Sequence, residues 1–144
     1  MATTSDGLSQ EERDAVKNRA KELRAEAKAG KDRAAGEALL LKAISEMEAD
    51  EQVLAEGLHE IASKEAPQLM PKTWYGFPAY ANAEGKVVFF FQPAAKFKTR
   101  YSTLGFSDPA QLDDGDIWPT SYALAKLTPA TKKTLTELIR RAVG

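Results

Sequence analysis

Cysteine is absent from this chain of 144 residues, and histidine occurs only once. Without cysteine the chain has no disulfide bond, no catalytic thiol and none of the usual cysteine-based zinc sites. Its longest apolar runs, VVFFF and ALLL, are far shorter than the ~20 residues that a membrane-spanning helix requires. The first residues are polar and lack the apolar core of a secretory signal. We therefore expect a cytoplasmic protein that folds without disulfides.

Aromatic residues are missing from residues 1–73, and all seven prolines lie from Pro67 onward. Both residue types are then concentrated in PKTWYGFPAY, residues 71–80. The charge changes as well, from 10 basic and 15 acidic residues over 1–70 to 10 basic and 6 acidic residues over 71–144. Aromatic residues favour strands, whereas alanine, leucine, glutamate and lysine favour helices. The sequence therefore predicts a helical first half and a sheet-forming second half that meet near Pro67.

Three helices are predicted in the first half. The first begins at a capping box, SQEE at residues 9–12, and ends at Gly30. The second spans about residues 34–47. The third spans about residues 51–65, with Asp50 as its N-cap and a proline shortly after its end. The apolar stripe of the first helix is narrow and half alanine, so we expect that helix to dock weakly on the rest of the protein.

The second half reads as strands followed by one helix. TWYGFPAY is predicted to be an extended segment in which Pro78 indicates an edge strand or a bulge, and NAEG, residues 82–85, a turn. The unbroken apolar run 87–91 predicts a central strand covered on both faces. TRYSTLGF and IWPTSYAL are further strand candidates, separated by a short helical turn that begins at Asp108. A final helix starts after Thr128 as its N-cap.

These elements predict an α+β fold, with an antiparallel sheet of about four to five strands packed against helices and preceded by N-terminal helices. The order YGFPAY, KVVFFF, YSTLGF and IWPTSYAL resembles the YdhG-like domain family, over roughly residues 58–143. The resemblance implies a shape related to frataxin, and some members of that family are labelled iron chaperones, although most have no assigned activity. The charged first helix is similar to an extension found in one subgroup. We expect residues 1–50 to form this extension and residues 51–144 the YdhG-like domain, packed as one unit.

Acidic residues are abundant between residues 37 and 65, which contain eight Asp and Glu. A frataxin-like surface could hold ferrous iron through carboxylates, and the candidate ligands for that weak alternative are Glu48, Asp50, Glu56 and Glu60. The other interpretation is a solvated helix face. His59 follows Glu56 at a Glu-x-x-His spacing, but helical geometry places both opposite the apolar face, so we expect them to point to water.

Basic residues of the first helix form a continuous stripe on a helical wheel. This stripe is a candidate docking surface for an acidic protein partner; the alternative is a fit against the acidic helices that follow. Nucleic acid is not expected, because residues 11–32 also contain six acids. The candidate docking residues are Arg13, Lys17, Lys21, Arg24 and Lys28.

Aromatic residues of the second half are candidates for a ligand groove, since one side of an aromatic strand can stack a planar ligand or a peptide. In an extended segment Trp74 and Tyr80 share one side, while Tyr75 and Phe77 share the other. The alternative is that all of these rings belong to the core. The candidate ligand-binding residues are Trp74, Tyr75, Tyr80, Lys98 and Arg100.

No catalytic constellation is visible in the sequence, which has one histidine, no glycine-rich phosphate loop and no nucleophile elbow. We therefore expect no enzyme and no cofactor. The function predicted from the sequence is a non-enzymatic module, a monomer that binds a small ligand or an acidic protein and no membrane. The alternative is a frataxin-like iron-binding protein that uses its acidic helices.

Overall fold

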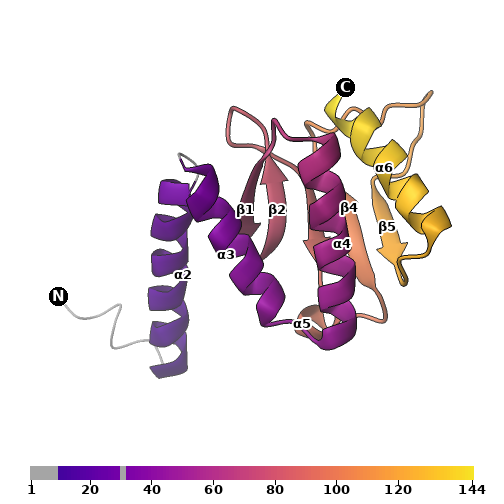
Figure 1. Ribbon diagram of the computed structural model, residues 1–144. Helices are drawn as coiled ribbons and strands as arrows, with labels where there is room; N and C mark the ends of the chain where they lie inside the picture. Colours follow the sequence, from indigo (N-terminus) through magenta and orange to yellow (C-terminus); the bar gives the residue numbers. More distant parts are fainter. Residues whose placement is uncertain (1–9, 30–31) are drawn as a thin grey trace.

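A computed structural model describes residues 10–29 and 32–144 of the chain, and Figure 1 shows how its elements are arranged. Five strands form one antiparallel sheet in the order β1-β2-β3-β4-β5. The α+β class predicted from the sequence is confirmed, with helices preceding the sheet. The strands are β1 (Met70–Trp74), β2 (Phe77–Ala81), β3 (Val87–Gln92), β4 (Ser102–Phe106) and β5 (Ser121–Leu124). The helices are α2 (Gln10–Ala29), α3 (Arg33–Ser45), α4 (Ala49–Glu65), α5 (Ala94–Phe97) and α6 (Pro129–Val143).

The helix starts follow from local capping. The carboxylate of Asp32 accepts hydrogen bonds from the backbone N–H groups of Ala34 and Ala35, at 2.9 and 3.2 Å, and so begins α3. Thr128 caps α6 as predicted, and Pro129 is the first residue of that helix. The predicted N-cap of α4 is wrong, because α4 begins at Ala49 and Glu48 takes the cap position.

The segment TWYGFPAY is a hairpin and not one extended strand. Trp74 ends β1 and pairs with Phe77, which begins β2. Tyr75 and Gly76 form the two-residue loop between them, with φ values of 52° and 78°. Two-residue hairpin loops of type I′ need positive φ at both positions, and glycine supplies this without strain. The chain therefore reverses at the point where the sequence pattern suggested a continuous strand.

Pro78 lies in an interior strand of the sheet, so the prediction of an edge strand is wrong for β2. It is the second residue of β2, one position before the ladder to β3 begins at Ala79. A proline near the start of a strand displaces few ladder hydrogen bonds. The irregularity in this ladder lies further along, between Tyr80 and Ala81. The turn predicted at residues 82–85 is confirmed, and the side chain of Asn82 accepts two backbone hydrogen bonds within it.

The central position of β3 is confirmed, but only one of its faces is covered by helices. Phe89 and Phe91 point toward the helices and are completely buried. On the opposite face, Phe90 is half-buried, and its ring lies against Gly105 of β4, where a Cβ atom would collide with it. On that face Phe90 contacts Trp74 of β1, and Phe97 of α5 packs against Phe77 of β2.

The helix layer belongs to the same hydrophobic core as the sheet. Helix α3 crosses β1 and β2 and contributes Leu40 and Ile44 to the core, while α4 and α6 cover the remaining strands (Figure 1). A two-pronged ion pair joins α4 to α6, with Nε of Arg140 2.6 Å from a carboxylate oxygen of Glu65. The hydrogen bond from Arg140 lowers the pKa of Glu65, and the same bond raises the pKa of Arg140.

Helix α2 lies at the side of the molecule, next to α3 and β1 (Figure 1). Its apolar residues are poorly covered, since Val16 is 59% exposed and Leu23 is 49% exposed. The expected weak docking of this helix agrees with these exposures. The predicted capping serine, Ser9, and the predicted stop, Gly30, lie outside the described residues.

Residues 107–120 connect β4 to β5 without a helix. The helical turn predicted from Asp108 is a simple turn, in which the N–H of Ala110 donates to the carbonyl of Ser107. The one-turn helix α5, which follows β3, was not predicted. None of the described helices is both long and apolar enough to cross a lipid bilayer.

Candidate functional site

Five aromatic side chains gather at the end of the sheet where the β1–β2 hairpin turns. Trp74 and Phe77 flank the turn, Phe90 comes from β3, Phe97 ends α5, and Tyr75 occupies the turn itself. The ring centroids of Trp74 and Phe90 are 5.3 Å apart, and those of Phe77 and Phe97 are 5.6 Å apart. Such edge-to-face contacts stabilise aromatic clusters. We call these five residues the aromatic face.

Tyr75 is the most exposed member of the aromatic face, with 55% of its surface accessible. Its backbone has φ of 52°, a left-handed conformation that disfavours bulky residues and favours asparagine or glycine. The ring centroid of Tyr75 lies 5.2 Å from that of Trp74, and the guanidinium of Arg19 lies 4.9 Å from the Tyr75 ring. A tyrosine therefore occupies a position where local backbone preference selects a small residue, and its ring is directed to the surface.

Helix α5 is fastened to the hairpin turn by one lysine. The Nζ of Lys96 donates a hydrogen bond of 3.0 Å to the carbonyl of Tyr75. This contact depends on Gly76, because a Cβ atom there would collide with the Lys96 ammonium. The chain ends α5 at Lys98, which is left-handed with φ of 54°. The turn, α5 and the aromatic face therefore form one local unit.

Basic residues outnumber acidic ones in the segment that forms most of this unit. Residues 66–107 contain five basic residues and a single acid, Glu84. Glu84 lies at the far end of the β2–β3 hairpin, where its carboxylate is 3.7 Å from Nζ of Lys86. The candidate residues Lys98 and Arg100 are exposed, and the guanidinium of Arg100 lies 5.3 Å from the ring of Tyr101. An anionic partner would therefore meet little negative charge from this segment itself, and the acids nearest to it, Glu46, Glu48 and Glu51, lie across a pocket from Lys96.

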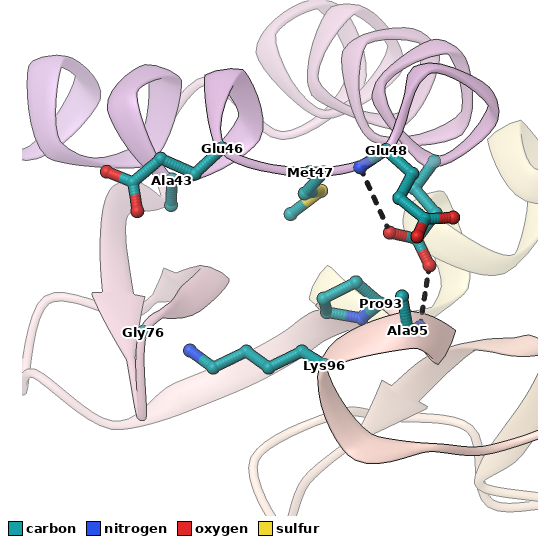
Figure 2. Close-up of a pocket in the computed structure, with 9 residues that line it drawn as sticks. Ala43, Glu46, Met47, Glu48, Gly76, Pro93, Ala95 and Lys96 are labelled. Atoms are coloured by element: carbon teal, nitrogen blue, oxygen red, sulfur yellow. Dashed lines mark hydrogen bonds between the residues drawn. The ribbon is translucent and has the colours of Figure 1, made fainter.

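A pocket of about 370 Å³ opens beside the hairpin turn, between the α3–α4 junction and α5 (Figure 2). Glu46, Met47 and Glu48 line its upper side in that view, and Pro93, Ala95 and Lys96 line its lower side. Its size is within the range of small-molecule sites. Ala43, Glu51 and Gly76 complete the lining.

Glu51 is buried, and its carboxylate fastens α4 to α5. One oxygen accepts from the N–H of Glu48, at 3.4 Å, and the other accepts from the N–H of Ala95, at 2.8 Å. A carboxylate at two helix starts compensates backbone donors that would otherwise lack partners. Glu51 therefore shapes the pocket wall, and both of its oxygens already have partners.

Tyr80, a candidate ligand-binding residue, lies in the core and not at the surface beside Tyr75. It is 3% exposed, and its ring stacks on Phe89 with centroids 4.6 Å apart. Its hydroxyl lies 2.8 Å from Nδ1 of His59, and Nε2 of His59 lies 3.0 Å from a carboxylate oxygen of Glu37. Burial raises the pKa of Tyr80 far above its usual value, and the nearby charge of Glu37 adds to this rise.

Helical geometry predicted that His59 points to water, and this prediction is wrong. Its side chain is only 13% exposed, because α3 lies over it and supplies Glu37. In the neutral imidazole, Nε2–H donates to the Glu37 carboxylate, which leaves Nδ1 to accept from the Tyr80 hydroxyl. The three side chains form a tie between α3, α4 and β2, with a structural role.

The structure separates the carboxylates proposed as iron ligands. Glu48, Asp50, Glu56 and Glu60 are all exposed, and the first and last are twelve residues apart, or roughly 18 Å along a helix. Within residues 10–29 and 32–144 no group of three or more His, Asp or Glu side chains could hold a metal ion.

The proposed basic docking stripe is only partly described. Lys17, Lys21 and Arg24 are exposed on α2, whereas Arg13 is half-buried. The side chain of Lys28 lies outside the described part of the chain.

The candidate residues predicted from the sequence include two residues of the aromatic face, Trp74 and Tyr75, and leave out Phe77, Phe90 and Phe97. Lys96, which holds α5 to the turn, was also not predicted, whereas its neighbour Lys98 was. The signal that could have found them is Gly76, because a glycine inside an apparent strand can mark a tight turn, and a turn there brings its neighbours together. No family model, curated protein or solved structure matches this chain.

Proposed function

We propose that this chain is a non-enzymatic binding module that captures an acidic segment of a partner protein on the aromatic face. The observation that carries the proposal is the exposed, left-handed Tyr75. A side chain that breaks a local backbone preference without being buried contributes little to the stability of the folded state, and such positions are typical of functional sites. Exposed aromatic residues are also enriched among the residues that dominate protein–protein binding.

Charge complementarity supports an acidic partner. The sheet region, residues 66–107, has five basic residues against one acid, and that acid already lies near Lys86. Acidic residues of a partner would be attracted to Lys98, which directly follows Phe97 of the aromatic face, while its apolar residues would pack on the rings. The five-stranded sheet with its helices also agrees with the α+β fold that a YdhG-like resemblance implies, and we propose that relationship on the sequence elements given above.

The test uses the ¹⁵N-labelled full chain and a synthetic peptide that alternates glutamate with phenylalanine. We expect its addition to shift the amide signals of Tyr75, Phe97 and Lys98, and to bind more weakly at high salt. Two matched peptides, one with glutamine for glutamate and one with alanine for phenylalanine, should each bind more weakly, because each removes one of the two interactions.

The variant Tyr75→Asn separates binding from folding. Asparagine suits the left-handed turn, so the free energy of unfolding should change by less than about 1 kcal/mol, while peptide affinity should fall about tenfold. Ile117→Asn is the matched control, since Ile117 is exposed and lies in the β4–β5 connection. Unchanged affinity in Tyr75→Asn, or shifts confined to α2, would overturn the proposal.

A further inference from the structure

The pocket beside the hairpin turn has opposite charges on its two sides (Figure 2). Glu46 follows α3 and extends its carboxylate over the opening, while Lys96 extends from α5 toward Gly76 on the other side. Within the described part of the chain these two residues form no ion pair with each other. Opposite charges that face one cavity without pairing leave positions for a ligand that carries both complementary charges.

Lys96 is held in place and retains free donor capacity. Its ammonium has three N–H donors, and the carbonyl of Tyr75 accepts one of them at 3.0 Å. Gly76 allows the ammonium to approach the backbone of the turn, because any side chain at that position would collide with it. The remaining donors are available to a carboxylate, and part of the side chain's freedom has already been lost, which favours binding.

The middle of the pocket is apolar. Met47 projects into it from the α3–α4 junction, and Pro93 lies opposite at the start of α5 (Figure 2). The buried carboxylate of Glu51 accepts one backbone hydrogen bond at each oxygen and holds the wall of the pocket. The exposed charged side chains that line the pocket are Glu46 and Glu48 on the upper side and Lys96 on the lower side, next to this apolar surface.

We propose that this pocket binds a zwitterionic small molecule of amino-acid size with an apolar side chain. Its ammonium group pairs with Glu46, its carboxylate accepts from Lys96, and its side chain packs between Met47 and Pro93. The volume of about 370 Å³ accommodates such a molecule. This site adjoins the aromatic face but relies on different side chains, Glu46, Met47 and Lys96, so the variants below distinguish the failure of one proposal from the failure of the other.

The test compares three probes that share one side chain and carry different charges: L-leucine, its methyl ester, which lacks the carboxylate, and N-acetyl-leucine, which lacks the ammonium. Each is titrated into the ¹⁵N-labelled full chain to about 10 mM, a range that detects millimolar affinity. We expect L-leucine to shift the amide signals of Met47, Gly76 and Lys96, and to bind at least several-fold more tightly than either derivative.

Two variants test which side chain of the pocket binds which charged group of the ligand. Glu46→Gln should weaken L-leucine and the ester but leave N-acetyl-leucine unchanged, and Lys96→Met should show the opposite selectivity. Glu84→Gln is the control, since Glu84 is exposed at the distant β2–β3 turn, and Tyr75→Asn should leave L-leucine binding intact. Equal binding of the three probes, or no shift with any of them at about 10 mM, would overturn the proposal.

Discussion

The hydrogen-bonded chain of Glu37, His59 and Tyr80 is the most constrained feature at the scale of single residues. It joins side chains separated by 22 and 21 positions, with distances of 3.0 and 2.8 Å. The Tyr80 hydroxyl lies in the core, where an unpaired polar group is costly. One ring nitrogen of His59 forms a hydrogen bond with the Tyr80 hydroxyl, and the other forms one with Glu37, which is partly exposed.

Tyr80→Phe tests this tie. It removes the hydroxyl and leaves Nδ1 of His59 without its buried partner, so the free energy of unfolding should fall by about 1–3 kcal/mol. Urea denaturation measures the change, and Tyr122→Phe provides a control in a half-buried tyrosine of the same sheet. Equal stability of Tyr80→Phe and the unmodified chain would show that the histidine does not depend on the hydroxyl.

Strand β3 has two faces with different environments, and this difference matters at the scale of elements. Phe89 is completely buried under the helices, whereas Phe90 lies in the half-open aromatic face. Phe89→Ala should therefore lower the free energy of unfolding by about 3–5 kcal/mol, and Phe90→Ala by clearly less. Chemical denaturation of both variants gives the comparison. Equal losses would mean that the second face is buried as deeply as the first.

The sequence predicted element types well because helices and strands differ in local composition and periodicity. The central position of β3 followed from its unbroken apolar run, and α6 from Thr128 and Pro129. The sequence did not predict what covers each face of β3, because an apolar run cannot show whether helices or neighbouring aromatic rings cover a face. The same ambiguity placed Phe90 in the predicted core.

The candidate site could be predicted only in part, since it is assembled from separate segments. Trp74 and Tyr75 stood out by composition, but Lys96 joins the turn only through the fold. His59 was misplaced because the position of α3 over α4 is a tertiary property that the helical wheel of α4 does not contain. Treating residues 73–80 as one strand also assigned Tyr80 to the same side as Trp74, which the hairpin reverses.

At the scale of the whole molecule, α2 contributes little to the hydrophobic core. Its two large apolar side chains, Val16 and Leu23, remain about half exposed, whereas α3 supplies Leu40 and Ile44 to the core. Deletion of residues 1–32 should therefore leave a folded domain with a cooperative unfolding transition. Amide exchange in α2 should be much faster than in the sheet, and faster still at high salt.

Circular dichroism with urea denaturation compares the truncated and full chains, and hydrogen exchange compares their elements. The matched control is a truncation that also removes residues 33–45, which should not fold because it deletes α3. Slow, salt-insensitive exchange in α2, or an insoluble chain after deletion of residues 1–32, would show that α2 is an integral part of the core.

The sequential strand order also has a kinetic consequence. Each strand pairs with the next strand along the chain, and the connections run from two residues at the β1–β2 turn to residues 107–120 before β5. Closing short loops costs little chain entropy, and folds with local strand pairing reach the native state quickly. The sheet can therefore form as successive hairpins, with the Tyr75–Gly76 turn as the shortest loop and the natural starting point. A residue exposed for binding would then also occupy the position where folding begins.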